Sequence, residues 1–180
     1  MIYTFLANGF EEVEALTPVD LLRRCELDVK TIGVGSQIVK GSHGISVLTD
    51  YEQNDLILDK NIDMIILPGG MPGTLNLEHS RIVQNAIDFC IQNKIYIAAI
   101  CAAPSILGHK GYLKNKTVTC FPGYENELVG ANVTTDLVCV DDKIITAKGA
   151  GASMTFSLKL VEILISKERA QLLEDSLQCK

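Results

Sequence analysis

Apolar residues in this chain form short unbroken runs, and between these runs they recur at every third or fourth position. An unbroken run predicts a strand buried on both faces, whereas the wider spacing predicts a helix with one apolar face. The predicted strands cover residues 2–6, 28–34, 63–67, 95–100 and 144–147, and the predicted helices cover 11–25, 82–90, 152–165 and 167–177. This alternation predicts an α/β fold: a doubly wound, three-layer α/β/α sandwich with a mainly parallel sheet.

Shorter apolar segments predict further strands, at residues 38–39, 45–48, 118–121 and 133–140. The turn-like sequence Gly41-Ser-His-Gly44 joins the first two, which predicts a hairpin beside the sheet. The segment 133–140 meets the strand at 144–147 across Asp141-Asp-Lys143, and this predicts a second hairpin.

The length and composition indicate one domain over residues 1–180, since 180 residues that are 47% apolar can form a single core. The net charge of −6 comes without any block of basic residues, which argues against nucleic acid as a partner. No apolar run is long enough to span a bilayer and the N-terminus has no basic leader, so we expect no membrane partner and a cytoplasmic location.

The six cysteines lie far apart along the chain, without the paired spacing of a zinc site. We therefore expect a reducing compartment, no metal and no cofactor. Free cysteines are usually small buried hydrophobes, and this reading suits all but one of the six. Cys101 differs because it follows a predicted central strand in the sequence Ala98-Ala-Ile-Cys-Ala-Ala-Pro104.

A cysteine at a sharp turn from strand to helix lies beside unpaired backbone N–H groups and the positive end of the helix dipole. Both favour the thiolate, so Cys101 is the candidate nucleophile. The small residues Ala102 and Ala103 permit a strained turn like the nucleophile elbow of hydrolases. Pro104 suits the first turn of the helix that follows, where no N–H group is missed.

Two other loops leave predicted parallel strands at the same edge of the sheet, where ligands bind in doubly wound folds. Gly69 and Gly70 offer backbone amides which, with that of Ala102, could bind an oxyanion or a substrate oxygen. Alternatively, the two glycines are needed only for the backbone dihedral angles of a turn. Glu14 could hold a proton beside the sulfur. The residue types alone do not separate Glu14 from Glu11 and Glu12, because acids are common at helix starts.

Taken in order and spacing, four segments resemble the ThiJ/PfpI superfamily, and within it the branch that contains the parkinsonism-associated protein deglycase and its bacterial relatives. These segments are Glu11-Glu-Val-Glu14 with Pro18-Val-Asp20, Leu67-Pro-Gly-Gly70, Ala98 to Pro104, and Gly149-Ala-Gly-Ala-Ser153. The resemblance runs nearly end to end and implies one ThiJ/PfpI-like domain, related to the class I glutamine amidotransferases, over residues 1–180.

The resemblance also implies a flavodoxin-like homodimer in which Cys101 is a nucleophile or an oxidation-sensitive thiol and Glu14 is its protonated partner. Gly70 and Ala102 would supply the oxyanion amides. Activities assigned in the family include glyoxalase III, deglycation of proteins, chaperoning and the sensing of oxidative stress. The implied partners are a small aldehyde substrate or glycated protein groups.

The chain departs from parts of this family at two positions. Members near the parkinsonism-associated protein carry a histidine in the loop occupied here by Cys120-Phe-Pro122, and protease-like members carry one directly after the nucleophile, where this chain has Ala102. Without that base a cysteine peptidase is disfavoured. His43 lies in the hairpin turn, where the family places an arginine near the active site across the dimer; it either approaches Cys101 of a partner chain or is simply an exposed turn residue.

Three hypotheses follow from these residues. The first is a cofactor-free enzyme in which Cys101 adds to 2-oxoaldehydes, of glyoxalase III or protein deglycase type. The second is a redox-sensing or chaperone-like protein in which Cys101 is oxidised rather than turning over. The third is a non-catalytic binding module, because a common fold does not fix a function.

Overall fold

A seven-stranded, mainly parallel sheet forms the centre of the computed structural model, which describes residues 1–179. Its strands are β1 (Ile2–Ala7), β2 (Val29–Val34), β5 (Tyr51–Glu52), β6 (Met64–Leu67), β7 (Tyr96–Ile100), β10 (Val138–Asp141) and β11 (Ile144–Ala147). Their order across the sheet is β10-β11-β7-β6-β1-β2-β5, and only β10 runs antiparallel to its neighbour.

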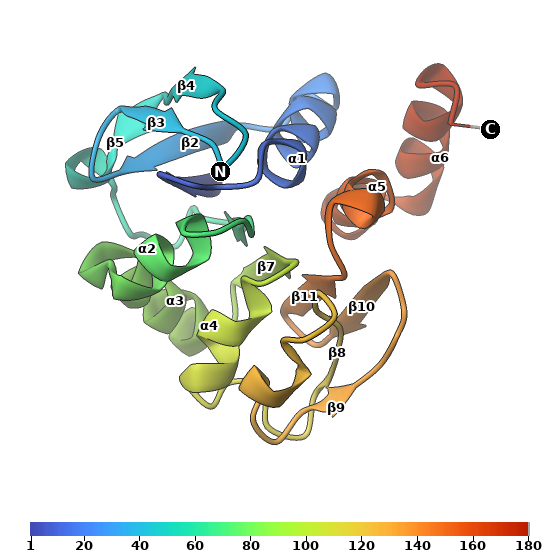
Figure 1. Cartoon of the computed structure of the whole chain (residues 1–180). Coiled ribbons are helices and arrows are strands. Elements are labelled where there is room, and N and C mark those ends of the chain that lie inside the picture. Colours follow the sequence, from blue (N-terminus) through green and yellow to red (C-terminus); the bar gives the residue numbers. More distant parts are fainter. Residues whose placement is uncertain (180) are drawn as a thin grey trace.

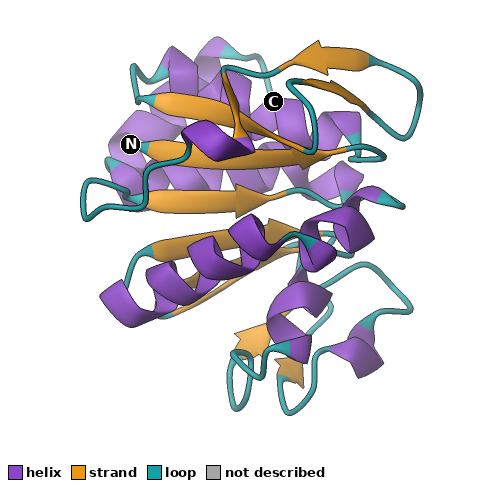
Figure 2. Ribbon diagram, turned by 90° about the vertical axis from the view of Figure 1, so that its left-hand side faces the viewer, coloured by secondary structure: helices purple, strands orange, loops and turns teal. Residues whose placement is uncertain are grey.

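Helices cover both faces of this sheet, as Figures 1 and 2 show. One face carries α1 (Glu12–Arg24), α5 (Ser153–Leu164) and α6 (Lys167–Ser176), and the other carries α2 (Gly73–His79), α3 (Arg81–Asn93) and α4 (Pro104–His109). The predicted three-layer α/β/α sandwich is therefore confirmed. Within residues 1–179, no helix combines the length and apolar composition that crossing a membrane requires.

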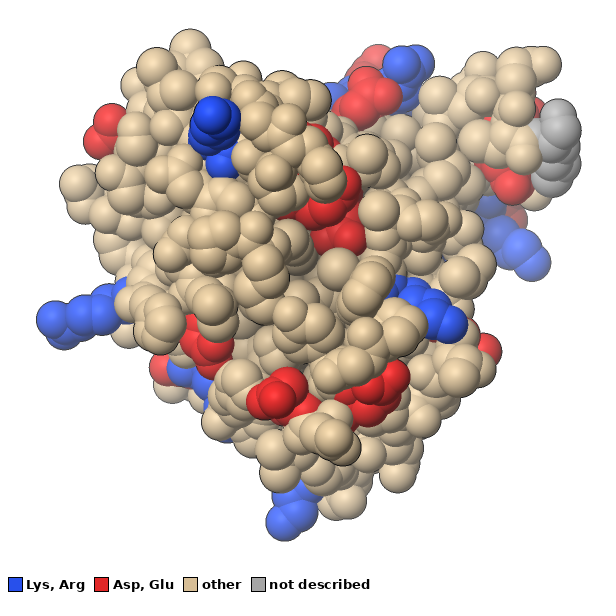
Figure 3. Space-filling model, viewed as in Figure 1, with Lys and Arg blue, Asp and Glu red and all other residues tan. Residues whose placement is uncertain are grey.

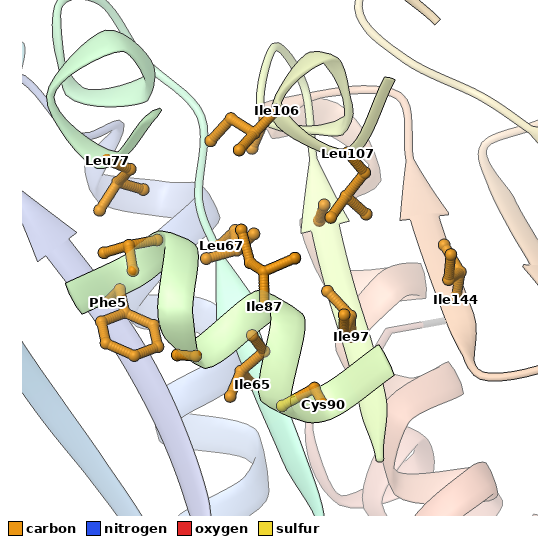
Figure 4. Packing of buried hydrophobic residues seen from close by; sticks show 14 of the residues in the cluster. Phe5, Ile65, Leu67, Leu77, Ile87, Cys90, Ile97, Ile106, Leu107 and Ile144 are labelled. Atoms are coloured by element: carbon orange, nitrogen blue, oxygen red, sulfur yellow. The ribbon is translucent and has the colours of Figure 1, made fainter. Parts of the chain in front are cut away.

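Alternate residues of each central strand supply the two halves of the core. Ile65 and Leu67 of β6 pack with Ile87 of α3, as Figure 4 shows, whereas Ile66 packs on the opposite face with Phe156 of α5. All five side chains are fully buried. Because both faces are covered, apolar residues can follow one another along a strand without interruption, which explains the runs seen in the sequence.

The predicted hairpin at 38–48 is confirmed as β3 (Ile38–Lys40) paired with β4 (Ser46–Leu48), outside the main sheet. Three short 3₁₀ turns complete the elements of residues 1–179: η1 (Gln53–Asp55), η2 (Glu125–Glu127) and η3 (Ala150–Ala152). Strand β5 escaped prediction because its two residues are polar or exposed.

The single strand predicted at 133–140 is wrong. Residues Asn132–Val133 form β9, which pairs in a separate two-stranded sheet with β8 (Thr117–Val118), and only β10 joins the main sheet. The predicted strand at 118–121 is likewise reduced to β8. The cause is a local turn, in which the Asp136 amide donates to Thr134 Oγ1 at 3.3 Å. Such side-chain bonds compete with strand pairing.

Phe156 tests the packing of the face that carries α1 and α5. Its side chain is fully buried, so Phe156→Ala removes a large apolar group and leaves a cavity. We expect the free energy of unfolding to fall by about 3–5 kcal/mol in a urea titration. Leu172→Ala, at a side chain 62% exposed on α6, should change it by no more than about 0.5 kcal/mol. Equal losses in the two variants would contradict this account of the core.

Candidate active site

Cys101 lies directly after β7 in a left-handed backbone conformation, with φ of 65°. This conformation costs a residue other than glycine about 1–3 kcal/mol and persists only where neighbours enforce it. The Cys101 amide donates to the carbonyl of Ala147 at 2.9 Å, and the Cys101 carbonyl accepts from the Phe121 amide at 2.8 Å. Helix α4 begins at Pro104, so the predicted strained turn from strand to helix is confirmed.

The Cys101 sulfur is half-buried and has three hydrogen-bonding neighbours. The backbone amides of Gly70 and Ala102 bind it, and so does the side chain of Glu14. The structure thus brings together Cys101 and the three residues predicted to act with it. Gly69 is placed differently: its amide donates to Glu14 Oε2 at 3.0 Å, so it positions the acid and does not face the sulfur.

Gly69 and Gly70 follow Pro68 at the end of β6, and the missing side chain of Gly69 lets the acid and the thiol approach each other. A Cβ on Gly69 would lie only 2.6 Å from both the Cβ of Cys101 and Oε2 of Glu14. Gly70 has a φ of 88°, which favours glycine for a second reason. The two glycines are therefore needed for the close approach as well as for the turn.

The three acids at the start of α1 have separate tasks, which the sequence left open. Glu11 is the N-cap, and its Oε2 accepts the Glu14 amide at 2.7 Å. Glu12 points to the hairpin turn, where its Oε1 accepts the His43 amide at 2.8 Å. Glu14 is 1% exposed and contacts the sulfur. Only Glu14 therefore belongs to the reactive centre.

Ala150 and Phe121 act through their backbones, a role that the sequence does not predict.

 The amide of Ala150 donates to the Glu14 carboxylate, and the Phe121 amide holds the Cys101 carbonyl. A backbone donor leaves no trace in residue type, so only the fold identifies it. The segment Gly149 to Ser153, which the resemblance singled out, is the one signal that pointed to this loop.

The protons of Glu14 and Cys101 are coupled. Burial raises the pKa of Glu14 to about 7, although its bonds from Cys101, Gly69 and Ala150 oppose the shift. Burial also raises the pKa of the Cys101 thiol, and the Glu14 charge adds to this, giving about 12 despite the amides of Ala102 and Gly70. The amides at the turn do favour the thiolate, as expected, but burial and the Glu14 charge outweigh them and the net shift is upward. We therefore expect the pair to lose one proton near pH 7 and to share the second until well above it.

A shared proton gives the thiol an unusual pH dependence. From about pH 7 upwards the thiolate fraction of Cys101 is set by how the proton divides between sulfur and Glu14, so it should not change with pH. We expect the rate of Cys101 alkylation by iodoacetamide, followed by peptide mass, to rise to a plateau from about pH 7 to beyond pH 9. In Glu14→Gln the plateau should vanish, and the rate should climb about tenfold per pH unit.

The exposed Cys179 is the internal control for this measurement, because its alkylation should follow the same profile in both proteins. A plateau that survives in Glu14→Gln would show that no proton is shared.

His43 contacts Glu12 of its own chain, with Nδ1 2.9 Å from Oε2. Burial raises the pKa of Glu12, but the bonds from the His43 ring and from the amides of His43 and Ile45 prevail and lower it to about 2. The contact fixes the hairpin turn on the start of α1. The approach of His43 to Cys101 of a second copy stays a prediction.

A metal ion could be held by the carboxylates of Glu11 and Glu12 and the His43 ring, since one ligand atom of each lies within 4.8 Å of the others. In the structure these atoms serve other bonds. Glu11 caps α1, and Glu12 accepts the amides of the hairpin turn. The positive end of the α1 dipole also opposes a cation at this position.

His109 is held between Glu78 and Glu127, which raise its pKa. No hydrogen bond joins an imidazole to Cys101 in the described part of the chain, 1–179. The side chain bonded to the Cys101 thiol is instead the Glu14 carboxyl.

A parallel α/β sandwich with a cysteine in a strained turn after a central strand, beside a buried acid, defines a flavodoxin-like protein with a cysteine elbow. The chain belongs to the DJ-1/PfpI family, whose model matches residues 1–163.

Curated relatives and solved structures agree with this assignment. The chain is 37% identical to protein DJ-1 homolog B of Arabidopsis thaliana over 92% of its own length, but it spans only 38% of that longer protein. It is 32% identical to the glutathione-independent glyoxalase DJR-1.2 of Caenorhabditis elegans, over 88% of this chain and 85% of that one. The structure of Toxoplasma gondii DJ-1, oxidized, superposes with a TM-score of 0.93 at 30% identity, over 98% of this chain and 97% of that one.

Proposed function

We propose that this protein converts 2-oxoaldehydes into 2-hydroxy acids without a cofactor, with Cys101 as the nucleophile and Glu14 as the proton carrier. The observation that carries the proposal is the buried contact between the Glu14 carboxyl and the Cys101 thiol, with the amides of Gly70 and Ala102 on the sulfur. A shared proton lets the thiol attack without a histidine, because the acid takes the proton as the sulfur bonds to carbon.

The first step forms a bond between Sγ and the aldehyde carbon. The carbonyl electron pair moves to the oxygen, the thiol proton passes to Glu14, and the Gly70 and Ala102 amides that bind the sulfur at rest are close enough to donate to the new oxyanion. Return of the proton from Glu14 to this oxygen gives a neutral hemithioacetal. Glu14 is then a carboxylate again and can act as a base.

The second step moves hydrogen within the adduct. Glu14 removes the proton from the former aldehyde carbon and returns one to the neighbouring carbon through an enediol, which leaves a thioester of the 2-hydroxy acid on Cys101. The aldehyde carbon is thereby oxidised and the ketone carbon reduced, so no external oxidant is needed. Water hydrolyses the thioester, and the thiol recovers its proton.

The printed name of the nematode relative, a glutathione-independent glyoxalase, supports this reaction class. The same chemistry would suit adducts of 2-oxoaldehydes on protein groups, which makes deglycation the related form of the proposal.

Charged side chains of both signs are mixed on the face seen in Figure 3, without a continuous basic patch there. Six free cysteines favour a reducing compartment such as the cytoplasm. We further propose that the chain forms a homodimer.

Purified protein with methylglyoxal tests this function. We expect lactate to form and Cys101→Ser to lose at least about a thousandfold in kcat, since its hydroxyl is a far weaker nucleophile than a thiol. Glu14→Gln should lose about a hundredfold or more, because the amide cannot carry the proton. Cys179→Ser, at an exposed thiol, is the matched control and should match the unmodified protein. Turnover that survives in Cys101→Ser would refute the mechanism.

A second candidate function is redox sensing, and the same donors favour it. A thiolate attacks peroxide to give sulfenic acid and water, and a second peroxide gives the sulfinic acid. The new oxygen atoms would lie beside the Gly70 and Ala102 amides and a protonated Glu14, which are hydrogen-bond donors. Four of the other cysteines, Cys25, Cys90, Cys120 and Cys139, are buried.

Mild peroxide followed by peptide mass analysis tests this candidate. We expect Cys101 to gain the mass of two oxygen atoms before Cys179 is oxidised, although Cys179 is the more exposed thiol. In Glu14→Gln the sulfinic form should accumulate at least several-fold more slowly, because the proton acceptor is lost. Oxidation of Cys179 ahead of Cys101 would count against sensing.

A further inference from the structure

A cavity of about 360 Å³ lies beside the reactive pair, between the loop that follows β8 and the loop that follows β11. Phe121, Pro122 and Leu137 form one part of its wall, and the backbone of residues 149–152 forms another. Lys148 is the one charged residue among the described lining residues, and its ammonium donates to the carbonyl of Thr135 at 3.4 Å. The cavity is therefore mainly apolar.

The cavity wall and the acid share one loop. A Cβ on Gly149 would lie 3.1 Å from the Phe121 ring and 3.9 Å from Oε1 of Glu14, so Gly149 separates the ring from the carboxyl by a single layer of backbone. The next residue, Ala150, donates its amide to Glu14. On the opposite side, Phe121 is tied to Cys101 through its amide. The cavity is therefore lined by two residues that bond directly to the acid and to the cysteine.

The apolar side chains of this cavity are open to water. Phe121 is 47% exposed and Leu137 is 52% exposed, and neither is part of the packed core. Exposed apolar side chains that line a concavity gain free energy when an apolar group covers them. A flat ring offers far more apolar area to cover such side chains than a methyl group does.

We propose that this cavity binds the non-reacting group of the substrate and that it selects aryl-substituted 2-oxoaldehydes over methylglyoxal; this inference rests on the proposed function. Cys101 and Glu14 act on the oxoaldehyde end, and the ring occupies the space bounded by Phe121 and Leu137. One additional methylene in an apolar pocket changes specificity by about 10–200-fold. Because this cavity is open, we expect kcat/KM for phenylglyoxal to exceed that for methylglyoxal by at least about tenfold, mainly through a lower KM.

Paired kinetics on the two aldehydes test the proposal. Leu137→Asn and Phe121→Asn make the wall polar at exposed positions, and the amide of residue 121 remains to hold Cys101. We expect both variants to bring the ratio of the two kcat/KM values close to one. Leu172→Asn, the same kind of change at an exposed leucine on α6, is the matched control and should keep the ratio of the unmodified protein. A ratio near one in the unmodified protein, or one unchanged in both cavity variants, would overturn the proposal.

A second readout separates this proposal from the function on which it rests. Acetophenone carries the ring but lacks the aldehyde, so it should slow the alkylation of Cys101 by iodoacetamide in the unmodified protein and not in Leu137→Asn, while acetone should slow neither. Protection by acetophenone without turnover of either aldehyde would refute the proposed reaction and leave the aryl-binding cavity in place. Turnover of methylglyoxal without protection or preference would refute the cavity and leave the reaction in place.

Discussion

The buried hydrogen bond between the Glu14 carboxyl and the Cys101 thiol links the local features of the site. The two groups can approach only because Gly69 has no side chain between them. The sulfur reaches the acid because Cys101 takes a left-handed conformation, which bonds to Ala147 and Phe121 hold in place. Glu14 is in position because Glu11 caps the first turn of α1. Two backbone bonds thus hold the strained residue, while Gly69 and Glu11 hold the acid.

The sequence predicted those parts of the molecule that side-chain type determines. Unbroken apolar runs identified β1, β2, β6, β7 and β11, and the small residues around Cys101 identified the turn. The short strands at the sheet edges were harder to predict. Strand β5 contains only Tyr51 and Glu52, and a turn at Thr134 interrupts the segment 133–140, whose apolar residues at both ends resemble one strand. In these places local hydrogen bonds decide the structure, and hydrophobic periodicity carries no information about them.

In the site, too, the sequence predicted what residue type and position determine and missed what tertiary packing determines. Cys101, Gly70 and Ala102 could be named from their places where predicted strands end, whereas only the family resemblance separated Glu14 from Glu11 and Glu12. Gly69 was named for the wrong contact, and the upward net shift in the pKa of Cys101 was missed, because burial and a neighbouring charge depend on tertiary packing. The Ala150 amide was missed altogether, since any residue but proline can provide it.

The loop after β11 serves two neighbours at once, and this limits how the protein can change. Its Gly149 backs onto Phe121 in the cavity and onto the Glu14 carboxyl, while Ala150 donates to that carboxyl. A side chain added here to reshape the cavity would push on the Phe121 ring and shift the amide that stabilises the charged acid. Substrate preference and the acidity of Glu14 therefore cannot be adjusted independently through this loop. Positions such as Leu137, which line the cavity without bonding to the acid, leave more freedom for divergence.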